Sequence, residues 1–464
     1  MSLLERPEAR ALLADAGVSA AAVRACRGRL EQFLRRYLPC FYRQEQRELA
    51  QVVLQGKLSR LERKTAEPIA YLAGRHRKPV QHFVGAGCWD DEAVLAELRR
   101  HVAEELADPD AVLVLDPSGF PKKGTDSCGV ARQWCGRLGK VDNCQVGVFL
   151  AYVTARGYAP LDRQLYLPRE WADDRQRRRA THVPQDVRFQ ESWRIGLDLI
   201  ERSGADLPFG WIAADDEFGR VSALRAALRW RRLRYVLDVP ANTLIRDLAH
   251  VPASGRPPWQ RVDAWAAAQP ASRWRRIRVG DGAKGPKVVR ALEAWVQTKD
   301  EDGGAGPRER LVVIRTVDQE PRVWYTLSNA PAEAPLERIV VVHSRRHGIE
   351  ELFQAGKGEV GLAHYEVRSW VGWHHHMTLS LLALWFVIRE QNRVGEKNPG
   401  ANGGADAPTL RAAAPAPATW PHADRRRNQP RVTPQRRGTH LPLARDHTPL
   451  PTTANAARWI NRLQ

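Results

Sequence analysis

The sequence predicts an α/β fold in which a mixed sheet is flanked by helices, preceded by a helical domain and interrupted by a β-rich insertion. A run of five apolar residues, 111–115, has the length and composition of a strand that is buried on both faces. Strand-like and helix-like segments then alternate up to residue 239, as in α/β proteins. Between residues 241 and 337, strand-like segments separated by Gly- and Pro-rich turns replace this alternation.

Residues 1–107 are expected to form the helical domain, because apolar residues recur there at spacings of three and four. Arginine and lysine are dense in the same region. This density fits either a solvated basic face of a helical bundle or a DNA-binding domain. The whole chain of 464 residues carries a formal net charge of +19, which favours the second interpretation and indicates nucleic acid as the partner.

The core of the fold is expected in residues 108–240. Its first strand runs into Asp116 and is expected to stop there, because two prolines and two glycines follow within eight residues. Further strands are expected at 145–153, 164–167, 211–214 and 235–239, and helices at 188–203 and 222–229. The first three strands would form a meander.

The insertion is assigned to residues 241–337 and is followed by the C-terminal helices of the core, 338–390. Strands of the insertion are expected at 274–279, 294–298, 310–316 and 322–328. The tail, 391–464, is rich in Ala, Pro and Arg and has few apolar clusters. We expect this tail to be disordered.

Acidic residues follow two of the expected core strands. Asp116 follows the first, and Asp215 with Asp216 follows strand 211–214. If these strands are neighbours, the carboxylates converge, and converging carboxylates suit a hard divalent cation. Alternatively, Asp116 simply caps the next turn. Lys122 and Lys123 come a few residues later and are candidates to contact a phosphate.

A helix near residue 346 carries a third acid between two cations. At about 100° per residue, Arg346, Glu350 and Lys357 lie within about 40° of one another, whereas Glu351 points about 100° away from Glu350. Such a stripe suits a metal ligand that sits beside phosphates. An ordinary row of helical ion pairs, which stabilises by only a few tenths of a kcal/mol, is the alternative.

With these residues in view, the sequence resembles the DDE transposases of bacterial insertion sequences. The resemblance is to the branch with an RNase H-like core, a β-strand insertion and a Tyr-Arg-Glu-Lys signature. Arg346, Glu350 and Lys357 match the signature, and His343 stands where the family has Tyr. His343 could partly replace the contact of that aromatic residue with phosphate.

Two more motifs carry the resemblance, which covers roughly residues 30–390. The first acid lies in LDPSGFPKKG, which is followed by the block GVARQWCGRLGKVDNCQVGV from Gly129 to Val148. The second-acid motif, Asp-x-x-aromatic-Gly, matches DDEFG at 215–219. This match assigns the second acid to Asp215, with Asp216 as its neighbour.

The resemblance implies a DNA transposase that binds the ends of an insertion sequence and catalyses metal-dependent strand cleavage and strand transfer of the cut-and-paste type. The residues implied to be catalytic and to hold two Mg²⁺ ions, with Mn²⁺ as a substitute, are Asp116, Asp215 and Glu350. The residues implied to contact DNA are Lys122, Lys123, His343, Arg346 and Lys357. The expected partners are double-stranded DNA, as inverted-repeat ends and as target, and a second copy of the chain in the DNA complex.

The location and two competing functions follow from the same features. The longest apolar stretch, 379–388, is too short to span a bilayer, and the N-terminus lacks the features of a secretion signal, so a cytoplasmic, nucleoid-associated protein is expected. The competing functions are a catalytically silent DNA-binding remnant and another RNase H-like nuclease such as a junction resolvase. The run 374–376 of three histidines is expected at the surface or facing DNA, and the six cysteines are expected to be free thiols.

Overall fold

The computed structural model describes residues 20–249, 255–282 and 285–397. The predicted disorder of the tail therefore lies outside the described residues, except for residues 391–397, which continue a helix.

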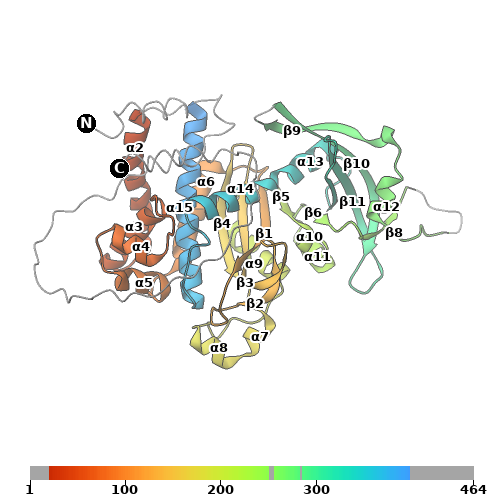
Figure 1. Cartoon of the computed structure of the whole chain (residues 1–464). Helices are drawn as coiled ribbons and strands as arrows, with labels where there is room; N and C mark the ends of the chain where they lie inside the picture. The colour runs from red at the N-terminus through yellow and green to blue at the C-terminus, as the bar shows by residue number, and fades with distance from the viewer. Residues whose placement is uncertain (1–19, 250–254, 283–284, 398–464) are drawn as a thin grey trace, which may run out of the picture. The chain divides into compact units, whose positions relative to one another are not determined.

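The core is a five-stranded part of a larger mixed sheet (Figure 1). Strands β1 (Val112–Pro121), β3 (Lys140–Val153) and β4 (Tyr158–Leu165) form an antiparallel meander, with β3 in the middle. Strands β5 (Trp211–Ala214) and β6 (Tyr235–Val239) continue the sheet beside β1 and run parallel to it. This order, β4-β3-β1-β5-β6, confirms the predicted mixed α/β fold with an RNase H-like core. The short strand β2 (Ala131–Cys135) pairs with the beginning of β3.

The β-rich insertion extends this sheet and does not form a separate one. Strand β12 (Val323–Ser328) pairs with β6, and β11 (Ala305–Thr316) pairs with β12. Strand β10 (Gly285–Lys299) lies next to β11 and also pairs with β9 and β7. The remaining strands are β7 (Leu244–Asp247), β8 (Gln260–Arg261) and β9 (Arg275–Gly282). One continuous sheet of twelve strands therefore carries both the core and the insertion over the described residues.

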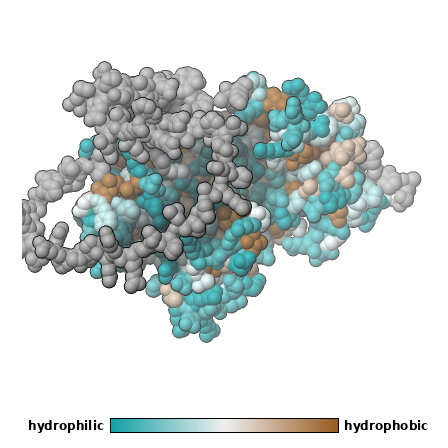
Figure 2. Space-filling model, viewed as in Figure 1, coloured by the Kyte–Doolittle hydropathy of each residue, from teal (hydrophilic) through white to brown (hydrophobic). Residues whose placement is uncertain are grey.

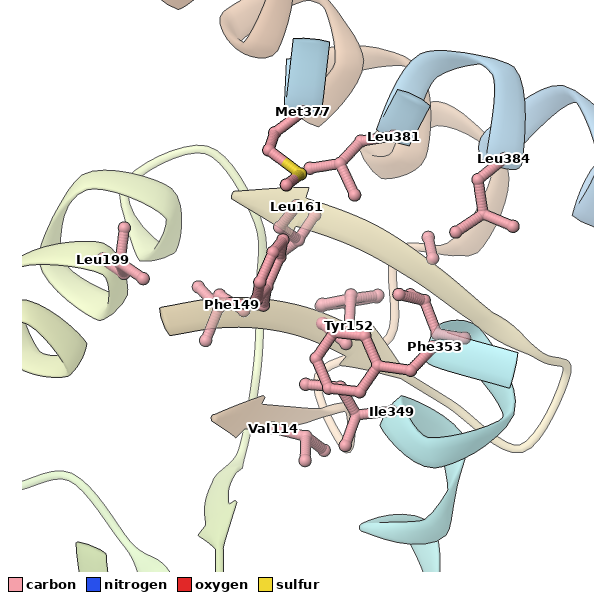
Figure 3. Packing of buried hydrophobic residues seen from close by; sticks show 14 of the residues in the cluster. Val114, Phe149, Tyr152, Leu161, Leu199, Ile349, Phe353, Met377, Leu381 and Leu384 are labelled. Carbon is pink, nitrogen blue, oxygen red and sulfur yellow. The ribbon is translucent and has the colours of Figure 1, made fainter. Parts of the chain in front are cut away.

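Helices cover both faces of the core sheet. On one face, α9 (Ser192–Gly204) approaches β1 so closely that a Cβ at Gly196 would lie 3.0 Å from Leu115 Cδ1. On the other face, α14 (His347–Glu359) places Phe353 5.2 Å from Phe149 between ring centroids. Figure 3 shows the apolar side chains of α14 and of α15 (Trp370–Lys397) turned toward the strands. Helix α13 (Leu336–Arg345) precedes α14 and packs on β9.

The N-terminal helices bury the opposite side of α15, so this long helix is enclosed. Lys57 Nζ donates a hydrogen bond of 2.8 Å to Ser380 Oγ, and Arg29 forms an ion pair with Glu390. The helices of this region are α2 (Ala20–Tyr37), α3 (Gln44–Lys57), α4 (Ala66–Leu72), α5 (Arg77–Gly85) and α6 (Asp91–Leu106), with the short 3-10 turn η2 (Leu38–Cys40). The predicted helical character of residues 1–107 is confirmed from residue 20 onward, since residues 1–19 lie outside the described ranges. The separate identity of this region as a DNA-binding domain stays a prediction.

The prediction that the three histidines lie at the surface is wrong. His374, His375 and His376 are all buried in α15, and burial lowers the pKa of each. The His375 ring stacks on Trp89 of the N-terminal region, with 3.8 Å between ring centroids. Because α15 is enclosed between the sheet and the N-terminal helices, even side chains on different sides of this helix are removed from water.

Short helices complete the described fold. They are α7 (Arg169–Asp173), α8 (Arg175–Ala180), α10 (Asp216–Gly219), α11 (Ser222–Trp230), α12 (Val262–Ala267) and the 3-10 turn η3 (Ala271–Arg273). Figure 2 shows hydrophilic residues over the region of α7 and α8. No described helix combines the length and the apolar character that crossing a membrane requires. The six cysteines are free thiols.

Candidate active site

Asp116 lies inside β1 and not at its end, which corrects the predicted strand boundary. The strand continues to Pro121 because β3 still pairs with it on one side, whereas its parallel partner β5 stops at the pair Leu115–Ala214. Asp116 is therefore the first residue of β1 with an open side, where prolines are tolerated. Side chains alternate along a strand, and Leu115 faces α9, so Asp116 lies on the face that α14 covers.

Asp215 follows Ala214 directly and caps the short helix α10. Its Oδ1 accepts a hydrogen bond of 3.1 Å from the Glu217 amide. Phe218 is buried in the core, and a Cβ at Gly219 would lie 1.8 Å from the Asp238 carbonyl oxygen. The residues of the Asp-x-x-aromatic-Gly motif thus have distinct physical roles: the acid caps the helix, the aromatic residue anchors it, and glycine permits contact with β6.

The two aspartates are close enough to influence each other's ionisation. Burial, together with the charge of Asp215, raises the pKa of Asp116 well above its ordinary value. Burial and the neighbouring Asp216 also raise the pKa of Asp215, although Arg346 lowers it. Glu217 belongs to the same group, since burial and Asp215 raise its pKa to about 7. Acidic side chains thus gather where the parallel pairing of β1 and β5 ends, which fits the converging carboxylates expected from the sequence.

Glu350 lies in the first turn of α14, on the side of Asp116. Its Oε1 is 3.3 Å from Arg346 Nη2 and its Oε2 is 2.9 Å from His347 Nδ1. These two neighbours lower the pKa of Glu350, with His347 making the larger contribution. The charge of Glu350 in turn contributes to the raised pKa of Asp116, whereas the charge of Glu351 contributes to the raised pKa of Tyr158. The two adjacent glutamates therefore face different residues, as the helical spacing predicted.

Arg346 interacts with four of the carboxylates of the site. Burial alone would lower its pKa, but the charges of Asp238, Glu350, Asp116 and Asp215 raise it. Its Nε lies 3.4 Å from Asp238 Oδ2. The residue stands between α13 and α14 and serves as the N-cap position of α14. A cation at the centre of these acids fits the stripe predicted from the sequence.

Asp238 is a further residue of the candidate site, and it is not among the residues that the sequence analysis assigned to that site. It is buried at the end of β6, accepts a hydrogen bond of 2.7 Å from Thr326 Oγ1, and lies 3.1 Å from His343 Nε2. Burial acts to raise the pKa of Asp238, but His343 and Arg346 lower it overall. A strand that ends in acid beside Asp215 was the available signal, since β6 follows β5 in the sheet.

The remaining predicted residues lie at different depths. Burial lowers the pKa of Lys357, whose ammonium group lies 5.2 Å from the ring centre of Phe353, while Asp116 acts in the opposite direction. Lys122 Nζ lies 3.4 Å above the Tyr365 ring, and burial lowers its pKa to about 8. Lys123 is exposed. His343 is turned toward Asp238, so the structure does not place it with Lys122 and Lys123.

The donor set suits a hard divalent cation, because it consists of carboxylates whose mutual repulsion a cation would relieve. Within the described ranges, however, no three His, Cys, Asp or Glu side chains are grouped closely enough to hold a metal ion. Glu350, which contacts Arg346 and His347, has to exchange these contacts to join Asp116 and Asp215 around one ion.

Two comparisons with known proteins found matches for this chain. The model of a family described as "DDE superfamily endonuclease" matches residues 36–286, which is more than half of the chain. The match includes Asp116 and Asp215 and ends before Glu350. A protein of Microchaete diplosiphon described as a probable transposase for insertion sequence element IS701 is 25% identical over 328 residues, or 68% of this chain and 77% of that protein.

Proposed function

The chain belongs to the DDE superfamily of endonucleases, and we propose that it is the transposase of an insertion sequence, which binds the ends of the element and moves it by cutting and pasting. A transposase-type nuclease acts on DNA, and the formal net charge of +19 suits that polyanionic substrate. The observation that carries the proposal is the adjacency of Asp116, where the parallel pairing of β1 ends, and Asp215, directly after β5, with Arg346 beside them.

We assign the binding of two Mg²⁺ ions, for which Mn²⁺ can substitute, to Asp116, Asp215 and Glu350. When bound, the ions would activate the attacking oxygen and stabilise the leaving oxygen of the phosphodiester. The protein places the three carboxylates on different elements: Asp116 on a strand, Asp215 at a helix cap, and Glu350 in the first turn of α14.

The cations of the site are assigned to the DNA backbone. Arg346 has a planar guanidinium group that can bind two phosphate oxygens, and it lies among the carboxylates that face the reacting phosphate. Lys357 follows on the same side of α14 and interacts with Asp116. Lys123 is exposed and can contact phosphate directly, and Lys122 contributes its charge from its place on the Tyr365 ring.

His343 is given a different part in this proposal. Because it lies between Asp238 and the Trp324 ring, whose centre is 5.6 Å away, it holds Asp238 and through it Arg346. A DNA contact of His343 therefore requires it to leave Asp238. The N-terminal helices are assigned to recognition of the inverted-repeat ends, and two copies of the chain would hold the two ends together.

The experiment that tests the proposal compares Glu350→Gln with Glu351→Gln. The two side chains are matched, since each is 46% exposed and each lies near His347. Strand cleavage of a duplex carrying the junctions that flank the gene is measured in Mg²⁺ on denaturing gels. Glu350→Gln should lower cleavage by orders of magnitude, because a charged metal ligand is lost while shape is preserved.

The control should behave differently in the same assay. Glu351→Gln is expected to keep cleavage within a few-fold, and both variants should unfold within about 1 kcal/mol of the wild type because both charges are exposed. DNA binding should persist in both. Equal losses of cleavage, or full cleavage by Glu350→Gln, would remove Glu350 from the site. Absence of cleavage by the wild type would favour the catalytically silent DNA-binding protein.

A further inference from the structure

Three arginines lie opposite one another on three neighbouring strands of the insertion. In the register of the sheet, Arg290 of β10 is paired with Arg276 of β9 on one side and with Arg315 of β11 on the other. Paired residues project to the same face, so the three side chains form a row across the sheet, called here the arginine row. Like charges directly opposite one another destabilise a sheet, and three in a row therefore call for an explanation.

The packing of the sheet does not require these arginines. On the same face, two residues along each strand, the register places Leu292, Val313 and Tyr325 side by side. These three side chains pack with Val262 and Trp265 of α12. The face thus changes from apolar and covered to cationic within two residues, and Arg276 and Arg290 are exposed.

The opposite face of the same strands is fully used by the core. Ile277, Ala291 and Ile314 are buried there, and Arg275 on that face forms an ion pair with Glu337 of α13. Among the described ion pairs, none involves a member of the arginine row. A solvent-facing surface that served only solubility would mix both signs of charge.

An aromatic side chain supports one member of the row. The guanidinium group of Arg315 lies 3.9 Å from the centre of the Trp274 ring, and Trp274 precedes Arg276 by two residues and so shares its face. This stacking leaves the guanidinium oriented and lowers the conformational entropy that it loses on binding a ligand. Arg278 follows on the same face, opposite Val288.

The arginine row lies at the same edge of the sheet as the candidate active site. The end of β6, Val239, pairs with Tyr325 of β12, and Tyr325 pairs with Val313 of β11. Strand β11 runs in the same direction as β6, because both are antiparallel to β12. Arg315 therefore lies two residues further in that direction than Val313. The row is thus beyond the carboxyl ends of the parallel strands, where Asp215 and Asp238 lie. It is on the other face of the sheet from Asp238, because Asp238 pairs with Thr326 whereas Val239 pairs with Tyr325.

We propose that the arginine row, with Trp274 behind Arg315, binds the phosphate backbone of double-stranded DNA that flanks the bond cut at the carboxylates. Strands lie about 4.8 Å apart, so the row spans on the order of 10 Å, a length in which a duplex carries about six phosphates. Arginine binds phosphate oxygens through paired N–H groups, and it reads no base sequence from the backbone. The inference rests on the proposed function, since it takes the bound duplex to be the substrate.

The test removes two charges of the row and compares the result with the removal of two other charges. The test variant is Arg276→Gln/Arg290→Gln, which leaves the stacked Arg315 in place. The control is Arg261→Gln/Arg275→Gln, because both residues are exposed on the insertion but are already paired, with Asp263 and Glu337. Binding of a fluorescent duplex of random sequence is measured by anisotropy as a function of salt, with EDTA present.

Two phosphate contacts should reduce the slope of log K against log salt by about 1.8 and weaken binding about 60-fold near 0.1 M salt. The control should change both quantities far less, and thermal unfolding should be similar for the two variants. Equal losses in test and control, or an unchanged slope in the test variant, would overturn the proposal. If the same assay with an RNA duplex of the same sequence showed weaker binding by the test variant while DNA binding was unchanged, the proposal would also be overturned.

The design separates this inference from the proposed function. Because EDTA prevents metal-dependent cleavage, the binding result does not depend on catalysis. A reduced slope together with a wild type that fails to cleave in Mg²⁺ would support the DNA-binding row and reject the nuclease. Normal cleavage together with an unchanged slope would reject the row and keep the nuclease.

Discussion

The position of the arginine row depends on how the insertion is anchored to the core, and Glu309 provides the test. Glu309 of β11 is completely buried (0% exposed). Its Oε1 lies 3.1 Å from Arg225 Nε and 3.0 Å from Arg229 Nη1, both on α11 of the core. Thr298 Oγ1 donates to its other oxygen at 3.2 Å, and the Tyr235 hydroxyl donates to Oε1. One carboxylate thus joins two strands of the insertion to α11 and β6.

Glu309→Gln should lower the free energy of unfolding substantially. Removing one charge of a buried ion pair typically costs about 3–5 kcal/mol, because the partner stays buried without compensation. Arg225 is 4% exposed and would remain in that position. For about 370 described residues the entropy of unfolding is about 0.8 kcal/mol/K, so the midpoint should fall by about 4–6 °C.

The measurement is calorimetric unfolding at neutral pH in EDTA, with Glu337→Gln as the matched control. Glu337 also joins a strand of the insertion to a helix, through its ion pair with Arg275, but it is 45% exposed. An exposed pair contributes about 0–1 kcal/mol, which predicts a shift of about 1 °C or less. Similar shifts in the two variants, or no shift in Glu309→Gln, would refute the anchoring role of the buried carboxylate.

Three further predictions concern the site and the enclosed helix. Because the folded-state pKa of Asp116 is raised, its ionised form costs stability at neutral pH. Asp116→Asn should therefore raise the unfolding midpoint in EDTA, and this gain should vanish as the pH falls toward the ordinary aspartate value; a lower midpoint at neutral pH would contradict it. Burial lowers the pKa of His375 to about 4, so it contributes stability above its unfolded pKa that is lost as the pH falls from about 6.5 to about 4, by about 3 kcal/mol. His375→Gln should make the unfolding midpoint depend less on pH between about 6.5 and 4, as measured by thermal unfolding. An unchanged pH dependence would refute the assignment. Asp238→Asn keeps the Thr326 hydrogen bond and loses the charge that holds Arg346, so cleavage should fall while DNA binding in EDTA persists; unchanged cleavage would make Asp238 structural only.

Much of the core could be predicted from the sequence because its strands are short apolar runs bounded by turns. Strands β5 and β6 have the predicted bounds, and α11 differs by one residue. The end of β1 was missed for a physical reason. Proline and glycine usually interrupt a strand, but β1 beyond Leu115 is paired on one side only and so tolerates them. That one-sided pairing depends on where β5 stops, which the residues of β1 do not reveal.

The histidines of α15 show a second limit. Residues that can carry charge were expected at the surface, yet His375 and its two neighbours are buried because helices and sheet enclose α15 from opposite sides. The enclosing residue Trp89 is nearly 300 positions away in the chain. The apolar character of 379–388 on all sides was the available signal, since a helix that is hydrophobic all round is buried.

In the candidate site, too, residues that depend on local sequence could be predicted, and residues that depend on distant contacts could not. Helical spacing is local, and it distinguished Glu350 from Glu351; the structure separates them in the same way, with Glu350 acting on Asp116 and Glu351 on Tyr158. Asp238 could not be assigned locally, because its role depends on Arg346, which approaches it only after the insertion has returned the chain to the core. The insertion therefore does more than separate the second acid from the third. By extending the sheet from β6, it delivers α13 and α14 to the edge where Asp116 and Asp215 lie, and it carries the arginine row to that same edge.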